Sequence, residues 1–227
     1  MKKTLIALMA LAGVAAADTI TLSPGTSSNV VSGGAINDNR PFEGASNYTC
    51  DDLKSIIDVM VDSTQSGWYV GVGQGHDSYP SQDFVLTDTG FDFSCRSGIS
   101  YEYVLALVEA PIDTTALTMS FTSSYNVSAS IWTFDKTTES ITLLQGRTTS
   151  KANTPCTITV ENLNLGANDM IVFAWSGSAE GGTSGGTKIS VTDVSMVATV
   201  TPSIPEPATA TLSLLALAGL AARRRRK

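Results

Sequence analysis

The sequence predicts an all-β protein: an antiparallel two-sheet β-sandwich, jelly-roll-like, with one short amphipathic helix and a C-terminal transmembrane helix. Three observations favour the sandwich. Ser and Thr make up 55 of the 227 residues, whereas Asp, Glu, Lys and Arg together make up only 15%, as is typical of strands with hydroxyl-rich outer faces. Apolar and polar residues alternate with a period of two in several segments. Turns rich in Gly, Asn and Asp separate about ten such segments.

The expected strands follow from these patterns. They are 19–22, 68–72, 91–95, 101–108, 117–122, 127–131, 140–144, 157–161, 170–175 and 188–200. The runs 101–108 and 170–175 are continuously apolar, which predicts central strands that are covered on both faces. In the last strand, Ile189 and Val191 have the opposite parity to Val194 and Met196, so we expect a β-bulge near Thr192 and Asp193.

One segment interrupts the β pattern. Leu53, Ile56, Ile57 and Met60 fall at positions i, i+3, i+4 and i+7, which predicts an amphipathic helix over residues 50–61, laid against the sandwich. Residues 23–47 and 176–187 are rich in Gly, Asn and Ser, and we expect irregular structure there.

The N-terminus has the three parts of a secretory signal peptide at residues 1–17. Lys2 and Lys3 precede an apolar stretch of about ten residues, and Ala15 and Ala17 are the small residues that signal peptidase requires. The stretch is too short for the ~20 residues of a membrane span, which argues against a permanent anchor. We therefore expect export by the secretion machinery, cleavage by signal peptidase, and a mature body at residues 18–200.

The C-terminus also has three parts. A linker at residues 201–207 contains Pro205-Glu206-Pro207, an uncharged apolar run occupies 208–222, and the last five residues, 223–227, are all cations. The prolines keep the linker extended. As a helix, the apolar run spans about 22 Å, marginal for a hydrocarbon core of ~30 Å. The cations favour a cytoplasmic end. From these residues alone, a permanent tail anchor is an open alternative.

This arrangement of Pro205, Glu206 and Pro207, a short helix and the basic end Arg223, Arg224, Arg225, Arg226 and Lys227 resembles a PEP-CTERM sorting signal. The resemblance covers residues 204–227. It implies a Gram-negative envelope protein that is held transiently in the inner membrane, cut near the Pro-Glu-Pro motif by an exosortase, and delivered to the cell surface or extracellular matrix, often alongside exopolysaccharide.

The charge of the body excludes one class of partner. Residues 18–204 carry 7 basic and 20 acidic side chains, a net charge of −13. Such a body repels phosphate backbones, so we expect no nucleic-acid binding.

Few residues offer cofactor or nucleophile chemistry, since the chain has one His and three Cys. An odd number of Cys in an exported protein permits one disulfide or none, and we prefer Cys50 with Cys95, which would join the helix to a strand. We expect no cofactor and no catalytic constellation. Asp88 and Asp92, four residues apart around a glycine, are a candidate pair for structural calcium, although a turn between strands explains the pair equally well.

Aromatic residues are the candidates for glycan contact. Trp132 and Phe134 lie in phase with Ser128 and Ser130, on the face expected to point outward, and Trp68 could contribute similarly. Exposed rings can stack on sugar rings, but the same residues could simply cover the sandwich. The segment 188–200 also resembles the last strand of many carbohydrate-binding sandwiches.

Three functions remain open from the sequence. The first is a non-enzymatic surface or matrix protein whose body adheres to polysaccharide. The second is a secreted glycan hydrolase that uses a carboxylate pair. Because the body has 20 acidic residues, the sequence does not identify which two would form the pair. The third is a structural matrix component without a discrete ligand site.

Overall fold

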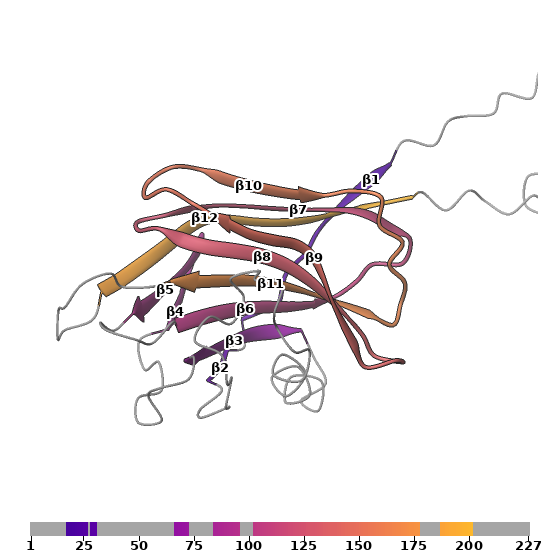
Figure 1. Ribbon diagram of the computed structural model, residues 1–227, viewed down its shortest axis with the longest axis horizontal. Helices are drawn as coiled ribbons and strands as arrows, with labels where there is room; N and C mark the ends of the chain where they lie inside the picture. Colours follow the sequence, from indigo (N-terminus) through magenta and orange to yellow (C-terminus); the bar gives the residue numbers. More distant parts are fainter. Residues whose placement is uncertain are drawn as a thin grey trace, which may run out of the picture. The chain divides into compact units, whose positions relative to one another are not determined.

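The body consists of two β-sheets packed face to face (Figure 1). The computed structural model describes residues 17–26, 28–30, 66–72, 84–95, 102–177 and 187–201. The first sheet has the order β10 (Cys156–Val160), β7 (Thr114–Ser123), β12 (Thr187–Val200), β5 (Gly90–Cys95) and β4 (Val85–Thr87), and β1 (Asp18–Thr21) also pairs with β12. The second has the order β2 (Ser28–Val30), β3 (Gly67–Val72), β6 (Glu102–Glu109), β11 (Asp169–Gly177), β8 (Val127–Asp135) and β9 (Ser140–Thr149).

The predicted all-β sandwich is confirmed, and each of the ten expected strands overlaps an observed one. The β2–β3 pair is parallel, while the pairs that join β5, β7, β10 and β12, and those that join β3, β6, β8, β9 and β11, are antiparallel. The short strands β2 and β4 were not expected. The predicted helices at 50–61 and 208–222 lie outside the described residues. Within the described ranges, no helix is long and apolar enough to cross a membrane.

The core lies between the sheets and is rich in aromatic side chains. Trp175 of β11 is fully buried, and its ring centroid lies 5.2 Å from that of Phe91, 6.0 Å from Trp68 and 6.1 Å from Phe121. Centroid separations of this size are favourable for aromatic pairs. Because Phe91 and Phe121 belong to the first sheet and the two tryptophans to the second, this cluster holds the layers together.

The central strands of the second sheet, β6, β11 and β8, are buried on both faces. Every side chain from Val104 to Val108 of β6 and from Met170 to Ser176 of β11 is buried, which confirms the prediction made from their continuous apolar runs. The exposure expected for Trp132 and Phe134 is wrong, because only 5% and 1% of their surfaces are accessible. Their parity was predicted correctly, but this face of β8 does not meet solvent.

The predicted bulge in β12 is confirmed and divides the first sheet. The register with β7 shifts between Thr192 and Ser195, and Asp193 has a φ of 54°, in the left-handed region that suits a bulge. Before the bulge, β12 pairs with β5 through Thr187–Val191. Beyond it, the neighbour on that side is β1, whose chain continues to Leu22, where the backbone N–H donates to the Met196 carbonyl oxygen at 2.8 Å.

Candidate functional site

A cavity of about 380 Å³ lies beside β12, at the point where the hydrogen-bonding partner of β12 changes from β5 to β1. Segments that are distant in the sequence supply its walls: the end of β1 and the residues after it, the β4–β5 hairpin, one residue of β3, and β12 beyond its bulge. The lining residues are Thr21, Leu22, Ser23, Pro24, Gly25, Thr26, Trp68, Leu86, Thr87, Asp88, Thr89, Gly90, Val194 and Met196. The volume falls within the range of about 300–1,000 Å³ that is usual for small-ligand sites.

The β4–β5 turn is held against the bulge by close contact and by a hydrogen bond. A Cβ atom built on Gly90 would lie 2.1 Å from the Val191 carbonyl oxygen, so only glycine permits this approach. The Val194 backbone N–H donates to the Thr89 carbonyl oxygen at 2.8 Å. The two-residue turn Asp88-Thr89, closed by the Thr87–Gly90 pair, is therefore fixed beside β12.

The opposite wall is the segment 22–26, which joins β1 of the first sheet to β2 of the second. The Trp68 Nε1–H donates to the Gly25 carbonyl oxygen at 3.1 Å, and the Gly25 N–H donates to Ser23 Oγ at 3.2 Å. Gly25 has a φ of 81°, a conformation that glycine adopts without steric cost. The first hydrogen bond ties the segment to the edge of the Trp68 indole ring, and the second is internal to the segment.

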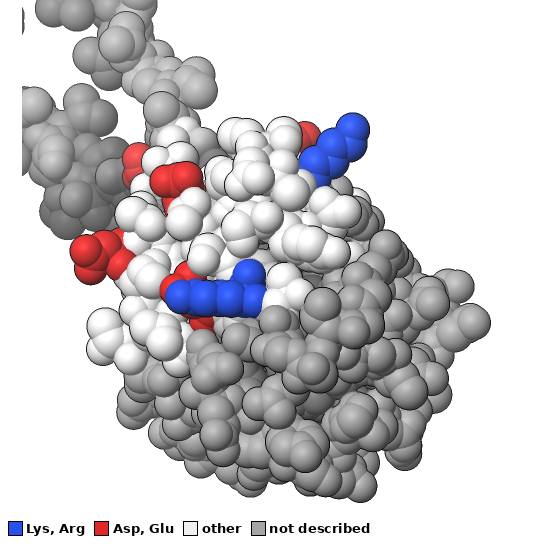
Figure 2. Space-filling model, turned by 90° about the vertical axis from the view of Figure 1, so that its left-hand side faces the viewer, with Lys and Arg blue, Asp and Glu red and all other residues white. Residues whose placement is uncertain are grey.

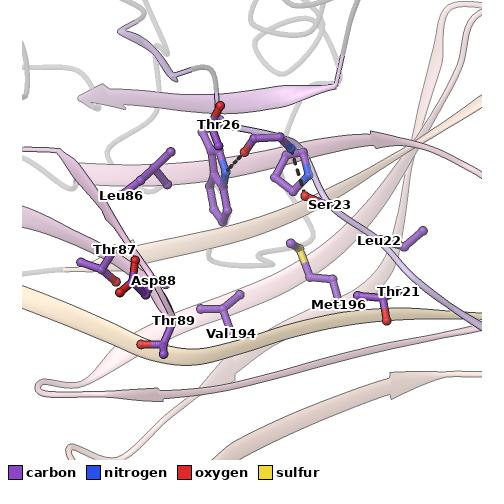
Figure 3. Close-up of a pocket in the computed structure, with 14 residues that line it drawn as sticks. Thr21, Leu22, Ser23, Thr26, Leu86, Thr87, Asp88, Thr89, Val194 and Met196 are labelled. Atoms are coloured by element: carbon purple, nitrogen blue, oxygen red, sulfur yellow. Dashed lines mark hydrogen bonds between the residues drawn. The ribbon is translucent and has the colours of Figure 1, made fainter.

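The cavity combines apolar surface with hydroxyl groups. In Figure 3, Leu86, Thr87, Asp88 and Thr89 lie on one side, Leu22 and Ser23 lie on the other, and the side chains of Val194 and Met196 lie between them. Trp68 adds an aromatic ring that packs on Phe91 at 5.2 Å and on Phe84 at 6.3 Å. Five lining residues carry a hydroxyl group: Thr21, Ser23, Thr26, Thr87 and Thr89. Such a site can accommodate a ligand with apolar faces and several hydroxyl groups.

The neighbouring charges are paired away from the cavity. Lys188 Nζ lies 2.8 Å from Asp92 Oδ2. Hydrogen bonds from Lys188, and then from Ser190, hold the pKa of the Asp92 carboxyl below its ordinary value of 3.8. Figure 2 shows one side of the molecule, on which acidic and basic groups are scattered over a described surface that is mostly uncharged.

The calcium candidate gains no support from this geometry. Asp92 is engaged by Lys188, whereas Asp88 lies in the turn and lines the cavity. Among the residues that the structure describes, no three His, Cys, Asp or Glu side chains gather in a way that could hold a metal ion. Calcium at Asp88 and Asp92 therefore stays a prediction.

The structure separates the three aromatic candidates. Trp68 lines the cavity, with 6% of its surface accessible. Trp132 and Phe134 are buried in β8 of the second sheet and do not belong to the lining. The Trp132 Nε1–H donates to Ser130 Oγ at 2.8 Å, so a serine that was interpreted as facing solvent instead satisfies a buried indole.

The remaining predicted sites lie wholly or partly beyond the described residues. They are Ala15 of the signal peptidase site, Cys50 and the side chain of Cys95, Pro205-Glu206-Pro207, and residues 223–227. Cys156 is a buried free thiol, and burial raises its pKa.

Sequence reasoning missed most of the cavity. Thr21–Thr26, Leu86, Val194 and Met196 were not predicted to share a site, because their proximity depends on the pairing of β12 with two successive partners. One signal was present. The reversal of parity at Thr192 and Asp193 marked the bulge, and the cavity lies beside it.

Comparison with known proteins identifies the C-terminal segment. Residues 203–227 match the PEP-CTERM protein-sorting motif. The motif marks an exported protein whose membrane-anchored precursor is processed by an exosortase. No curated protein matches the sequence.

Solved structures that are similar to the body have low sequence identity to it. One is the enzymatically active domain of bacteriophage CBA120 tailspike protein 4. The alignment covers 57% of this chain and 19% of the tailspike chain, at 16% identity and a TM-score of 0.39. The xylan-binding module CBM15 aligns over 61% and 93%, at 17% identity and a TM-score of 0.37. The N-terminal cellulose-binding domain of Cellulomonas fimi β-1,4-glucanase C aligns over 60% and 91%, at 16% identity and a TM-score of 0.34.

Proposed function

We propose that the chain is a cell-surface or extracellular-matrix protein of a Gram-negative bacterium. Signal peptidase recognises Ala15 and Ala17 and releases a chain that starts at Asp18. The helix at 208–222 holds the precursor in the inner membrane, with the basic residues 223–227 on the cytoplasmic side. An exosortase then cuts near Pro205-Glu206-Pro207. The match of residues 203–227 to the sorting motif supports this route, as does the positive-inside rule.

Intact-mass spectrometry of the protein collected from the surface and medium of producing cells tests the route. We expect a product that begins at Asp18 and lacks residues 208–227. Retention of residues 208–227 would instead support a permanent tail anchor, and retention of 1–17 would contradict signal peptide cleavage.

We further propose that the body is a non-enzymatic module that adheres to polysaccharide through the cavity between β1, β12 and the β4–β5 hairpin. The observation that carries this proposal is the chemistry of the lining, in which Trp68, Leu22 and Met196 provide apolar surface and five residues provide hydroxyl groups. A sugar ring has apolar C–H faces and a hydroxyl perimeter, so it can use both kinds of surface at once.

The alternative, a secreted glycan hydrolase, requires two carboxyl groups about 5–9.5 Å apart. Asp88 is the one carboxylate among the described residues that line the cavity. Release of reducing sugar by the purified chain would favour the hydrolase, and binding without release supports adhesion.

Co-sedimentation with insoluble polysaccharides tests binding through the cavity. Thr87 lies at the exposed edge of the site on β4, so Thr87→Trp fills the mouth without changing the core. Thr157 is exposed on β10 and is not part of the lining, which makes Thr157→Trp a matched control. We expect Thr87→Trp to weaken binding about tenfold or more and Thr157→Trp to leave it unchanged. Equal binding by both variants, or no binding by the unmodified chain, would overturn the proposal.

A further inference from the structure

One charged group faces the cavity. Among the described lining residues, Asp88 is the one that carries a charge at neutral pH, and its side chain is exposed to solvent. Figure 3 places it beside Thr87 and Thr89, on the side of the cavity opposite Ser23. The hydroxyl groups of the lining can serve many ligands, but a carboxylate discriminates between cationic, neutral and anionic ones.

The position of Asp88 is fixed by its backbone. The turn is closed by the Thr87–Gly90 pair and joined to the bulge by the hydrogen bond from the Val194 N–H to the Thr89 carbonyl oxygen at 2.8 Å. Gly90 makes its close approach to β12 directly after the turn. A charged group on a rigid turn binds its partner with a smaller loss of conformational entropy than one on a flexible loop.

None of the ion pairs between described residues includes Asp88. The ammonium group of Lys188 is held by Asp92 at 2.8 Å, and Lys136 lies 3.4 Å from Glu109. The net charge of −13 over residues 18–204 adds a long-range field that attracts cations and repels anionic polymers. The carboxylate of Asp88 and the net charge of the body therefore both favour a cationic ligand.

We propose that the cavity takes amino-sugar units with a free, protonated amine, from a polysaccharide such as a poly-glucosamine. This inference rests on the proposed function, since it specifies the ligand of the same site. The C–H face of the sugar lies on the apolar surface formed by Leu22, Trp68 and Met196, its ammonium group pairs with Asp88, and its hydroxyl groups bond to the threonine and serine side chains. Acetylation of the amine removes the ion pair, and a uronic acid places a second anion beside Asp88.

The test measures binding of the full chain in detergent to length-matched oligomers of glucosamine, N-acetylglucosamine and galacturonic acid. The measurement is made at about pH 5.5, where the amine of a glucosamine unit is protonated. We expect glucosamine oligomers to bind about threefold more tightly than acetylated ones, the size of effect usual for one solvated ion pair, and galacturonate oligomers to bind least. Added salt should reduce this preference.

Two substitutions separate the local ion pair from the overall field. Asp88→Asn removes the carboxylate at the cavity. Asp113→Asn removes the same charge from an exposed position outside the lining, and Asn tolerates the φ of 62° found there. We expect Asp88→Asn to abolish the preference for the free amine and Asp113→Asn to retain it.

The other outcomes decide against the inference in distinguishable ways. Equal binding of the free and acetylated oligomers would overturn it and leave polysaccharide adhesion intact. If both substitutions reduce the preference for the free amine equally, the preference comes from the overall charge of the body, and the role of Asp88 is overturned. Absence of binding to all three oligomers, and to neutral insoluble polysaccharides, would overturn the proposed function together with this inference.

Discussion

Gly90→Ala tests whether the β4–β5 turn is fixed against the bulge of β12. The new Cβ atom would lie 2.1 Å from the Val191 carbonyl oxygen and 3.0 Å from both the Val191 carbonyl carbon and Val194 Cγ2. Carbon and oxygen atoms in favourable contact lie about 3.3–3.6 Å apart, so one strand must move by more than about 1 Å. Two of the three close atoms belong to the backbone, and rotation of a side chain cannot relieve the overlap.

The cost follows from what this movement breaks. Overpacking of a tight site costs about 1–3 kcal/mol, and loss of the hydrogen bond from the Val194 N–H to the Thr89 carbonyl oxygen adds about 0.5–1.5 kcal/mol. We expect the free energy of unfolding to fall by about 2–4 kcal/mol. For a body of this size, the melting temperature should fall by roughly 5–15 °C. Thermal unfolding of the purified chain, followed by tryptophan fluorescence, measures the change.

Gly166→Ala is the matched control. The Cβ atom of an alanine there would meet no atom closer than Asp169 Oδ2 at 4.0 Å. A substitution of this kind is neutral or stabilises by about 0.4–1 kcal/mol, because alanine reduces the entropy of the unfolded chain. If Gly90→Ala unfolds within about 1 °C of the unmodified chain, or if both variants lose stability equally, the turn is not held as described and the rigid position of Asp88 is lost with it.

Three further predictions concern residues of the first sheet. Asp193→Val should lower the free energy of unfolding by about 1–2 kcal/mol in urea, whereas Asp193→Gly should change it little, because the φ of 54° at this residue disfavours a β-branched side chain; equal losses would contradict the bulge. Lys188→Met should lower the free energy of unfolding by less than about 1 kcal/mol at pH 7. The folded-state pKa of Asp92 lies below its ordinary 3.8, so the stabilisation is present above pH 3.8 and disappears as the pH falls through the folded-state value; a stability difference that persists in stronger acid would contradict the ion pair. Cys156 should react slowly with iodoacetamide in the folded chain and rapidly in urea, since burial raises its pKa; peptide mass mapping gives the rate at this site, and equal rates would show that the thiol is exposed.

The sequence predicted those parts of the fold in which one physical rule dominates. Alternation identified β7 and β10 because one face of each strand packs on the core, as the buried Met119 and Ile158 show. The reversal of parity located the bulge because residues on both sides of it must bury their apolar side chains. The strands β2 and β4 were missed, since segments of three residues carry too little pattern and form only beside their partners.

The error at Trp132 has a physical cause. Serines at positions 128 and 130 suggested a face in water, yet Ser130 is fully buried and accepts the Trp132 Nε1–H. A hydroxyl group can be satisfied by solvent or by a neighbouring side chain, and alternation does not distinguish the two. The cavity was beyond prediction for a different reason, because its walls come from segments that only the sheet order brings together.

Hydrogen exchange measured by mass spectrometry, with and without a glucosamine oligomer, tests the central claim most directly, since it locates the ligand on the chain. The account predicts that the oligomer slows amide exchange in residues 21–26, 86–90 and 193–196, the segments that surround the cavity, and leaves β9 and β10 unchanged. Binding that slows exchange only outside these three segments would contradict the assignment of the cavity as the polysaccharide site.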